Sequence, residues 1–128
     1  MRKILILMLP LLAAGFVYAA ATPGYTVTDR AKVYYGNPDH FTKPAVLVAN
    51  AVFECIPEYQ EIKKKGLTSK DPEYWLLLDK ANKKFYAALR KVADREGHDL
   101  VMEIGTIQAE EGYSLPNITG TVIAALEQ

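Results

Sequence analysis

Two histidines stand next to aspartates, and these pairs are the first candidates for catalytic chemistry. Asp39-His40 lies in a segment rich in turn-forming residues, and His98-Asp99 directly follows a predicted helix. A carboxylate that orients an imidazole can produce a general base. Neither histidine has a third ligand at metal-site spacing, and the sequence holds no glycine-rich phosphate loop and no Gly-x-Ser-x-Gly motif. We therefore predict that the chain is not an enzyme and uses no metal or cofactor. A base at His98, held by Asp99, is the alternative.

The single cysteine could also carry chemistry. Cys55 has no second cysteine to pair with, so the fold must stand without a disulfide inside the chain. It lies in an apolar stretch between Phe53 and Ile56. We expect a small buried core residue, and a reactive or intermolecular thiol is the alternative.

Four lysines cluster around a predicted turn at Gly66: Lys63, Lys64, Lys65 and Lys70. Such a cationic tip could contact anionic lipid headgroups or lipopolysaccharide, or could steer acidic binding partners. The alternative is an ordinary solvated helix end. The chain as a whole has 15 basic and 15 acidic side chains, so a nucleic-acid partner is not expected.

Residues 74–78 form the densest apolar stretch after the N-terminal segment. One helix face cannot bury all five of these residues, so some must contact another helix, another subunit or a binding partner, and aromatic residues are favoured at such contacts. The candidate client or subunit surface comprises Tyr74, Trp75, Leu77, Leu78 and Phe85.

A long helix is expected to position these apolar residues. Asp71 is a suitable N-cap, Pro72 is tolerated at the first helical position, and Gly97 is a suitable C-terminal stop. The helix would be about 37 Å long at 1.5 Å per residue. Apolar residues alternate at spacings of four and three, which predicts a heptad-like seam. The seam consists of Tyr74, Leu78, Ala81, Phe85, Ala88 and Val92, and Leu77, Leu89 and Ala93 widen it.

A second helical pattern precedes the long helix. It spans residues 52–62, with a kink or a new start expected at Pro57 and a glycine cap at Gly66. Short strands are predicted at residues 32–35, 45–49, 100–104 and 113–115, and residues 105–108 either extend the third of these or begin another. Asn117 is a candidate N-cap for a final helix with its body at residues 121–126.

The N-terminus has the three parts of a cleavable secretory signal. Arg2 and Lys3 precede an apolar stretch of about 15 residues, which is short for a membrane span, and the small residues Ala19-Ala20-Ala21 fit a cleavage site. We therefore predict a signal peptide at residues 1–21 and an exported, periplasmic protein. Residues 22–43 are expected to be an N-terminal arm or loop, because turn-forming residues dominate them.

Three stretches resemble the Skp family of periplasmic chaperones, also called OmpH-like. Residues 45–59 end in Ile-Pro-Glu-Tyr and are similar to the family's first strand, which leads into a helix that often reads SPEY. Residues 89–101 are similar to the family's return helix, which closes with Gly-[Tyr/His]-Asp-Leu-Val. Residues 117–123 are similar to the family's helix start, with Asn117 in place of Asp. The resemblance therefore assigns a Skp/OmpH-like domain to residues 44–128.

The resemblance implies an α+β fold with a small strand-containing trimerisation body, a coiled-coil-like helical hairpin over about residues 51–96 and a C-terminal helix. It implies a homotrimeric chaperone, or holdase, that binds unfolded outer-membrane or envelope proteins without ATP. Two features depart from the family: the hairpin has roughly half the usual length, and the chain is not strongly basic. The alternative is a structural or adaptor trimer that binds one folded envelope partner.

Overall fold

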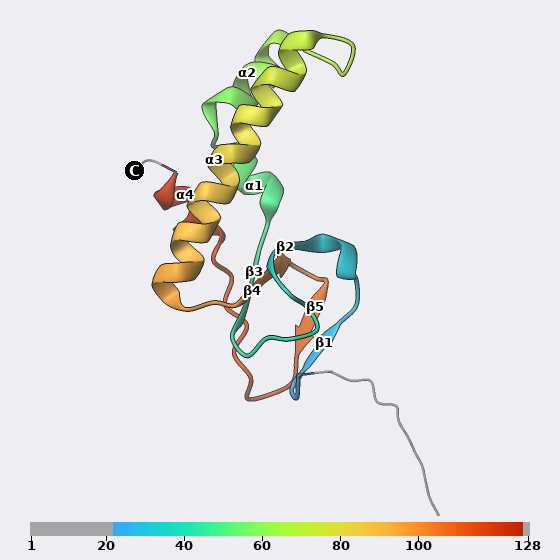
Figure 1. The fold of residues 1–128 in the computed structure, drawn as a ribbon, viewed down its shortest axis with the longest axis vertical. Coiled ribbons are helices and arrows are strands. Elements are labelled where there is room, and N and C mark those ends of the chain that lie inside the picture. The colour runs from blue at the N-terminus through green and yellow to red at the C-terminus, as the bar shows by residue number, and fades with distance from the viewer. Residues whose placement is uncertain (1–21, 127–128) are drawn as a thin grey trace, which may run out of the picture.

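The computed structural model of the protein describes residues 22–126, so the predicted signal peptide lies outside the described residues. Helices and two small sheets form an α+β fold, as expected, with a long helix running from the sheets to the opposite end of the molecule (Figure 1). The strands are β1 (Tyr25–Val27), β2 (Val33–Gly36), β3 (Pro44–Leu47), β4 (Leu100–Glu103) and β5 (Ile107–Ala109). The helices are the 3-10 turn η1 (Arg30–Lys32), α1 (Ala49–Phe53), α2 (Pro57–Lys65), α3 (Pro72–Glu96) and α4 (Thr119–Ala125).

The central strand of the three-stranded sheet is β4, which pairs in parallel with β3 and antiparallel with β2. A separate two-stranded sheet joins β1 to β5. The outer edge of β3 is also paired, because Val46 N–H donates to the Pro116 carbonyl at 2.9 Å and Ile118 N–H donates to the Val46 carbonyl at 2.8 Å. Residues from both ends of the described chain therefore build one body.

The N-terminal segment corrects the sequence-based expectation. Residues 22–43 were expected to form an arm or loop with one short strand at residues 32–35. That strand is present as β2, but β1 was not predicted, and both strands belong to the sheets. Gly36 fits against the turn before β4, where a Cβ would overlap the Asp99 carbonyl oxygen. The segment is thus an integral part of the body.

The helical hairpin begins and ends largely where local sequence signals predicted. Pro57 is the first residue of α2, and the chain at Ile56 is extended, which confirms a break there. Gly66 ends α2 and Gly97 ends α3, both in the left-handed conformation. The predicted strand at residues 45–49 is shifted, because β3 ends at Leu47 and Ala49 already begins α1, where its N–H donates to a Glu103 carboxylate oxygen at 3.1 Å.

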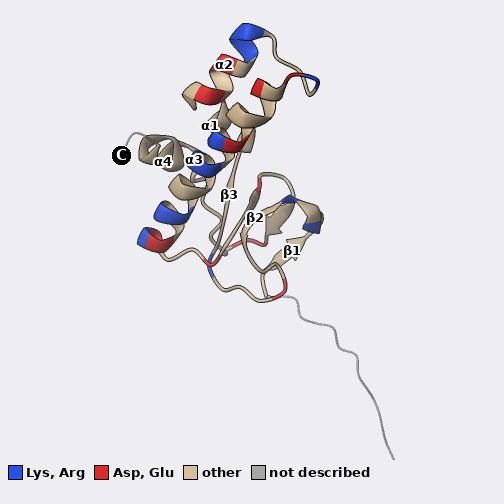
Figure 2. Cartoon of the chain, turned by 45° about the horizontal axis from the view of Figure 1, so that its top comes forward, with Lys and Arg blue, Asp and Glu red and all other residues tan. Residues whose placement is uncertain are grey.

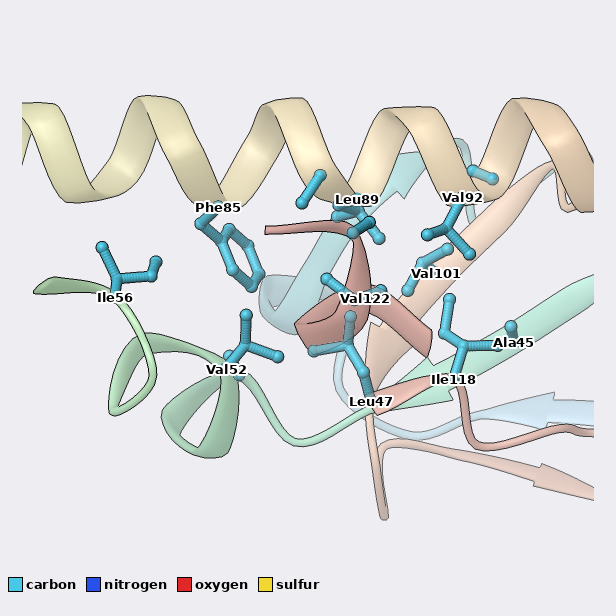
Figure 3. Close-up of a cluster of buried hydrophobic side chains, with 14 of the residues drawn as sticks. Ala45, Leu47, Val52, Ile56, Phe85, Leu89, Val92, Val101, Ile118 and Val122 are labelled. Carbon is cyan, nitrogen blue, oxygen red and sulfur yellow. The ribbon is translucent and has the colours of Figure 1, made fainter. Parts of the chain in front are cut away.

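The main core lies where α3 crosses the sheet and α4 (Figure 3). Phe85 is 1% exposed, stacks on Phe53 with the ring centroids 4.7 Å apart, and meets Tyr34 edge to face. The predicted seam is confirmed over most of its length. The buried residues of α3 are Leu77, Ala81, Phe85, Ala88, Leu89, Val92 and Ala93, whereas Tyr74 and Leu78 are only half-buried.

The C-terminal part differs in detail from the predictions. The segment predicted at residues 105–108 begins a separate strand, β5, rather than extending β4. Residues 113–115 are not a strand. The residue before α4 is Ile118, and the Asn117 carboxamide oxygen accepts from the Thr119 N–H at 3.0 Å and its hydroxyl at 2.6 Å. Asn117 therefore stabilises the helix start from one residue further back. Within residues 22–126, no helix is both long and apolar enough to cross a membrane.

Candidate functional site

The free end of the hairpin carries the largest exposed apolar side chains of α3. Trp75 is 54% exposed and Leu76 is 56% exposed. The Trp75 ring is held in place, because its Nε1–H donates to the Ser69 carbonyl at 2.8 Å and Tyr74 packs against it edge to face at 5.0 Å. An ordered, exposed indole beside an exposed leucine is suited to binding another apolar surface.

The structure divides the apolar residues chosen from the sequence. Leu77 and Phe85 are buried in the chain's own core, so their assignment to a client or subunit surface is wrong. Tyr74 and Leu78 are half-buried, and Trp75 is exposed. Successive helical residues lie about 100° apart, so Trp75 and Leu76 point away while Leu77 faces inward.

Two exposed apolar residues of α3 were missed. Leu76 was omitted from the candidate set, and Tyr86, which is 41% exposed, was not considered. Both residues fall outside the predicted seam. Apolar residues outside the seam are expected to be exposed, so the sequence pattern could have identified them. Their exposure shows that the part of the α3 surface outside the core carries more apolar area than the sequence pattern predicts.

The predicted cationic tip is partly neutralised. Lys63 pairs with Glu54 at 2.7 Å, and Lys65 bridges Glu61 at 2.9 Å and Glu73 at 2.8 Å. These contacts raise the pKa of Lys65, first through its hydrogen bond to Glu73. Basic and acidic residues therefore lie close together at this end of the hairpin (Figure 2). Lys64 and Lys70 are exposed and form no ion pair within residues 22–126, so they retain the cationic character of the tip.

A second ion pair joins α2 to α3, in addition to that between Lys65 and Glu73. The Lys84 ammonium lies 2.8 Å from Glu58 Oε2, and the Glu58 side chain is only 19% exposed. The hydrogen bond from Lys84 lowers the pKa of Glu58. The start of α2 is therefore joined to the middle of α3 by polar as well as apolar contacts.

The His98-Asp99 pair does not form a catalytic dyad. His98 is buried rather than exposed at a turn, and its Nε2 lies 3.5 Å from Glu96 Oε1. The Asp99 carboxylate instead accepts from the N–H groups of Thr42 at 2.7 Å and Lys43 at 2.8 Å. Burial would raise the pKa of Asp99, but these hydrogen bonds outweigh burial and lower it. Asp99 thus anchors the loop before β3.

The other candidate groups are also accounted for structurally. The Asp39 carboxylate forms a two-point pair with Arg30, at 2.6 and 2.7 Å, which lowers the pKa of Asp39 and leaves His40 without an orienting partner. Cys55 is exposed between α1 and α2, so the expectation of a buried core residue is wrong. Within residues 22–126, no three His, Cys, Asp or Glu side chains are grouped so that they could hold a metal ion.

Comparisons with protein-family models, curated proteins and solved structures give no match for this chain.

Proposed function

We propose that the protein is an exported, Skp/OmpH-like holdase that binds unfolded outer-membrane or envelope proteins without ATP. The observation that carries the proposal is the exposed pair Trp75 and Leu76 at the free end of the hairpin. Covering such surface with an apolar segment of a client removes both from water and is reversible. Residues 1–21 would direct export to the periplasm, and the body would assemble as a homotrimer.

The order of elements supports this proposal. From β3 onward the chain runs strand, helical hairpin, two strands and helix, which is the order that the resemblance implies. The three similar stretches lie on β3 with α1, on the end of α3 with β4, and on α4. A trimer would present three exposed Trp75–Leu76 pairs. If all three contact one client chain, their weak contacts together produce tighter binding than any one of them alone.

Aggregation suppression tests the proposal directly. An unfolded outer-membrane β-barrel protein is diluted from urea into buffer with and without excess mature protein, and light scattering is followed. We expect suppression by the native chain and loss of most of it in the double variant Trp75→Ser/Leu76→Ser.

The matched control is Ile104→Ser, because Ile104 is 46% exposed but lies in the turn between β4 and β5, at the body and away from the free end of the hairpin. It should suppress aggregation as the native chain does. No suppression by the native chain at several-fold excess would refute the holdase, and equal loss in the double variant and the control would refute the assigned surface. Sedimentation of the mature chain tests the trimer separately.

A second candidate function is an adaptor trimer that binds one folded envelope partner. It is favoured by an aromatic surface on the body, where Tyr113 is 47% exposed and its ring meets Tyr25 edge to face at 5.5 Å. The substitution Tyr113→Ser separates the two functions. It would abolish capture of a single folded partner but leave aggregation suppression unchanged, because Tyr113 is remote in sequence and structure from the hairpin tip.

Charge is the basis of one further proposed contact. Lys64 and Lys70 could bind anionic lipid or lipopolysaccharide at the hairpin tip, since neither is neutralised within the described chain. Cosedimentation with anionic vesicles should then fall in Lys64→Gln/Lys70→Gln. It should remain in Lys63→Gln, because Lys63 is already paired with Glu54.

A further inference from the structure

A second heptad-like stripe runs along the free half of α3, on a flank of the helix beside its buried face. It consists of Trp75, Asp79, Asn82 and Tyr86, at spacings of four, three and four residues. At 3.6 residues per turn these four positions fall within about 60° of the helix surface. Its next two positions toward the body, Leu89 and Ala93, are buried. The two aromatic residues and Asp79 are exposed, and Asn82 is half-buried. We call this set the outer seam.

We infer that two copies of the chain pair through their outer seams, with the two α3 helices antiparallel. In an antiparallel helix pair with two-fold symmetry, each residue of one copy faces a residue of the other copy, and the two residue numbers always add up to the same value. Centring the axis between Lys80 and Ala81 places Trp75 opposite the partner's Tyr86 and Asp79 opposite the partner's Asn82. Each aromatic ring then meets an aromatic ring, and each polar residue meets a polar one.

The polar centre selects this orientation over a parallel one. A parallel pair would set Asp79 against Asp79 of the second copy, which brings two carboxylates together. In the antiparallel pair the Asn82 amide can donate to the carboxylate of Asp79, which keeps its ion pair to Lys83 at 3.0 Å. A polar pair inside a heptad seam fixes register at some cost in stability.

Charge complementarity extends beyond the four seam positions. The same register brings Arg90 opposite Asp71 of the second copy, which joins opposite charges at both ends of the contact. Arg90 is exposed and forms no ion pair within residues 22–126, and Asp71 is half-buried at the start of α3. The outer seam is therefore complementary to itself in polarity, and the residues just beyond its two ends are complementary in charge.

The contact is small, so the association should be weak. Four partly exposed aromatic rings and the residues between them bury less than the roughly 1,200 Å² of a standard interface. The pairing goes beyond the proposed function and does not require it. If the body trimerises, pairing of α3 joins two trimers; if it does not, pairing joins two single chains.

Sedimentation equilibrium of the mature chain, from micromolar to near-millimolar concentration, tests the pairing. We expect the mass to double with rising concentration. Trp75→Glu should weaken the doubling step by about tenfold or more. The matched control is Leu76→Glu, because Leu76 is equally exposed but lies about a quarter turn from the outer seam, and its doubling should match that of the native chain.

Orientation is tested with Asn82→Asp alone and combined with Asp79→Lys, because the combination sets opposite charges against each other only in the antiparallel register. Asn82→Asp alone should weaken doubling by about tenfold at pH 7, and Asp79→Lys in the same chain should restore it. Circular dichroism checks that each variant is folded. Absence of doubling in the native chain, or equal weakening by Leu76→Glu and Trp75→Glu, would overturn the pairing, and failure of Asp79→Lys to restore doubling in Asn82→Asp would overturn its orientation. None of these measurements uses a client, so failure of the holdase would not affect them.

Discussion

The two ends of α3 differ in a way that hydrophobicity alone does not explain. Residues 74–78, at the free end, are the most apolar stretch of the helix, yet only Leu77 of these five is buried. Further along, where the sequence alternates with charged residues, the helix buries Phe85, Leu89 and Val92. Burial follows from which elements lie opposite the helix. The body end faces β2, α1 and α4, whereas the free end faces only α2.

This difference leads to a division of roles. The body end should determine the free energy of unfolding, and the free end should determine what the protein binds. Substitutions in one region should therefore leave the property of the other region largely unchanged, and pairs of variants with different burial test this separation.

The largest expected effect on stability is that of Phe85→Ala. Removing a fully buried ring that stacks on Phe53 should lower the free energy of unfolding by about 3–5 kcal/mol. Urea denaturation followed by circular dichroism measures this. The neighbouring Tyr86→Ala is the control and should cost about 1 kcal/mol, since that residue is 41% exposed rather than fully buried. Similar losses in the two variants would show that burial of the side chain in the core does not set the loss in stability.

A pair of glycines gives the next comparison. Gly36→Ala should lower the free energy of unfolding by about 3 kcal/mol, because φ is +89° and a Cβ would overlap the Asp99 carbonyl oxygen. Gly66→Ala, at the free end, meets open space and should cost only about 1–2 kcal/mol from its left-handed conformation. Thermal or urea unfolding of both variants checks the order. A larger loss for Gly66→Ala would contradict it.

Asp99 should make the free energy of unfolding depend on pH. Its lowered pKa means that the ionised carboxylate is favoured in the folded state, so its contribution is present above the unfolded-state pKa and is lost as pH falls below about 4. Asp99→Asn should therefore lower the free energy of unfolding by about 2 kcal/mol at pH 7 and much less near pH 3. Urea titrations at both values measure this, with the exposed Glu111→Gln as control. A loss independent of pH would exclude the ionised carboxylate as its source.

Local signals in the sequence predicted the helices better than the sheets. The bounds of α3 follow from Pro72 at its start and Gly97 after its end, which act within one turn of the helix. By contrast, β1 has only three residues and forms by pairing with β5, about 80 residues away. A segment rich in turn-forming residues gives no sign of such a distant partner.

The candidate site could be predicted only in part for a similar reason. The sequence indicates that residues 74–78 cannot all be buried, but it does not show which of them the body and α2 will cover. Cys55 was expected in the core because its neighbours are apolar, yet it lies in the turn that Pro57 imposes between α1 and α2, and there it is exposed. Exposure depends on tertiary packing, which local patterns do not encode.

The smallest expected effect concerns the ion pairs of the hairpin tip. Lys65→Gln removes contacts to both Glu61 and Glu73, but all three side chains are more than 40% exposed. Exposed ion pairs contribute little because water and salt screen them. We expect no resolvable change in the urea midpoint, and none in its dependence on salt between low and physiological ionic strength. Lys84→Gln is the contrasting variant, because it leaves the largely buried Glu58 without its partner, and it should be measurably less stable. If Lys65→Gln proved the more destabilising of the two, the tip would be a structural element in its own right, and the division between a stabilising body end and a binding free end would fail.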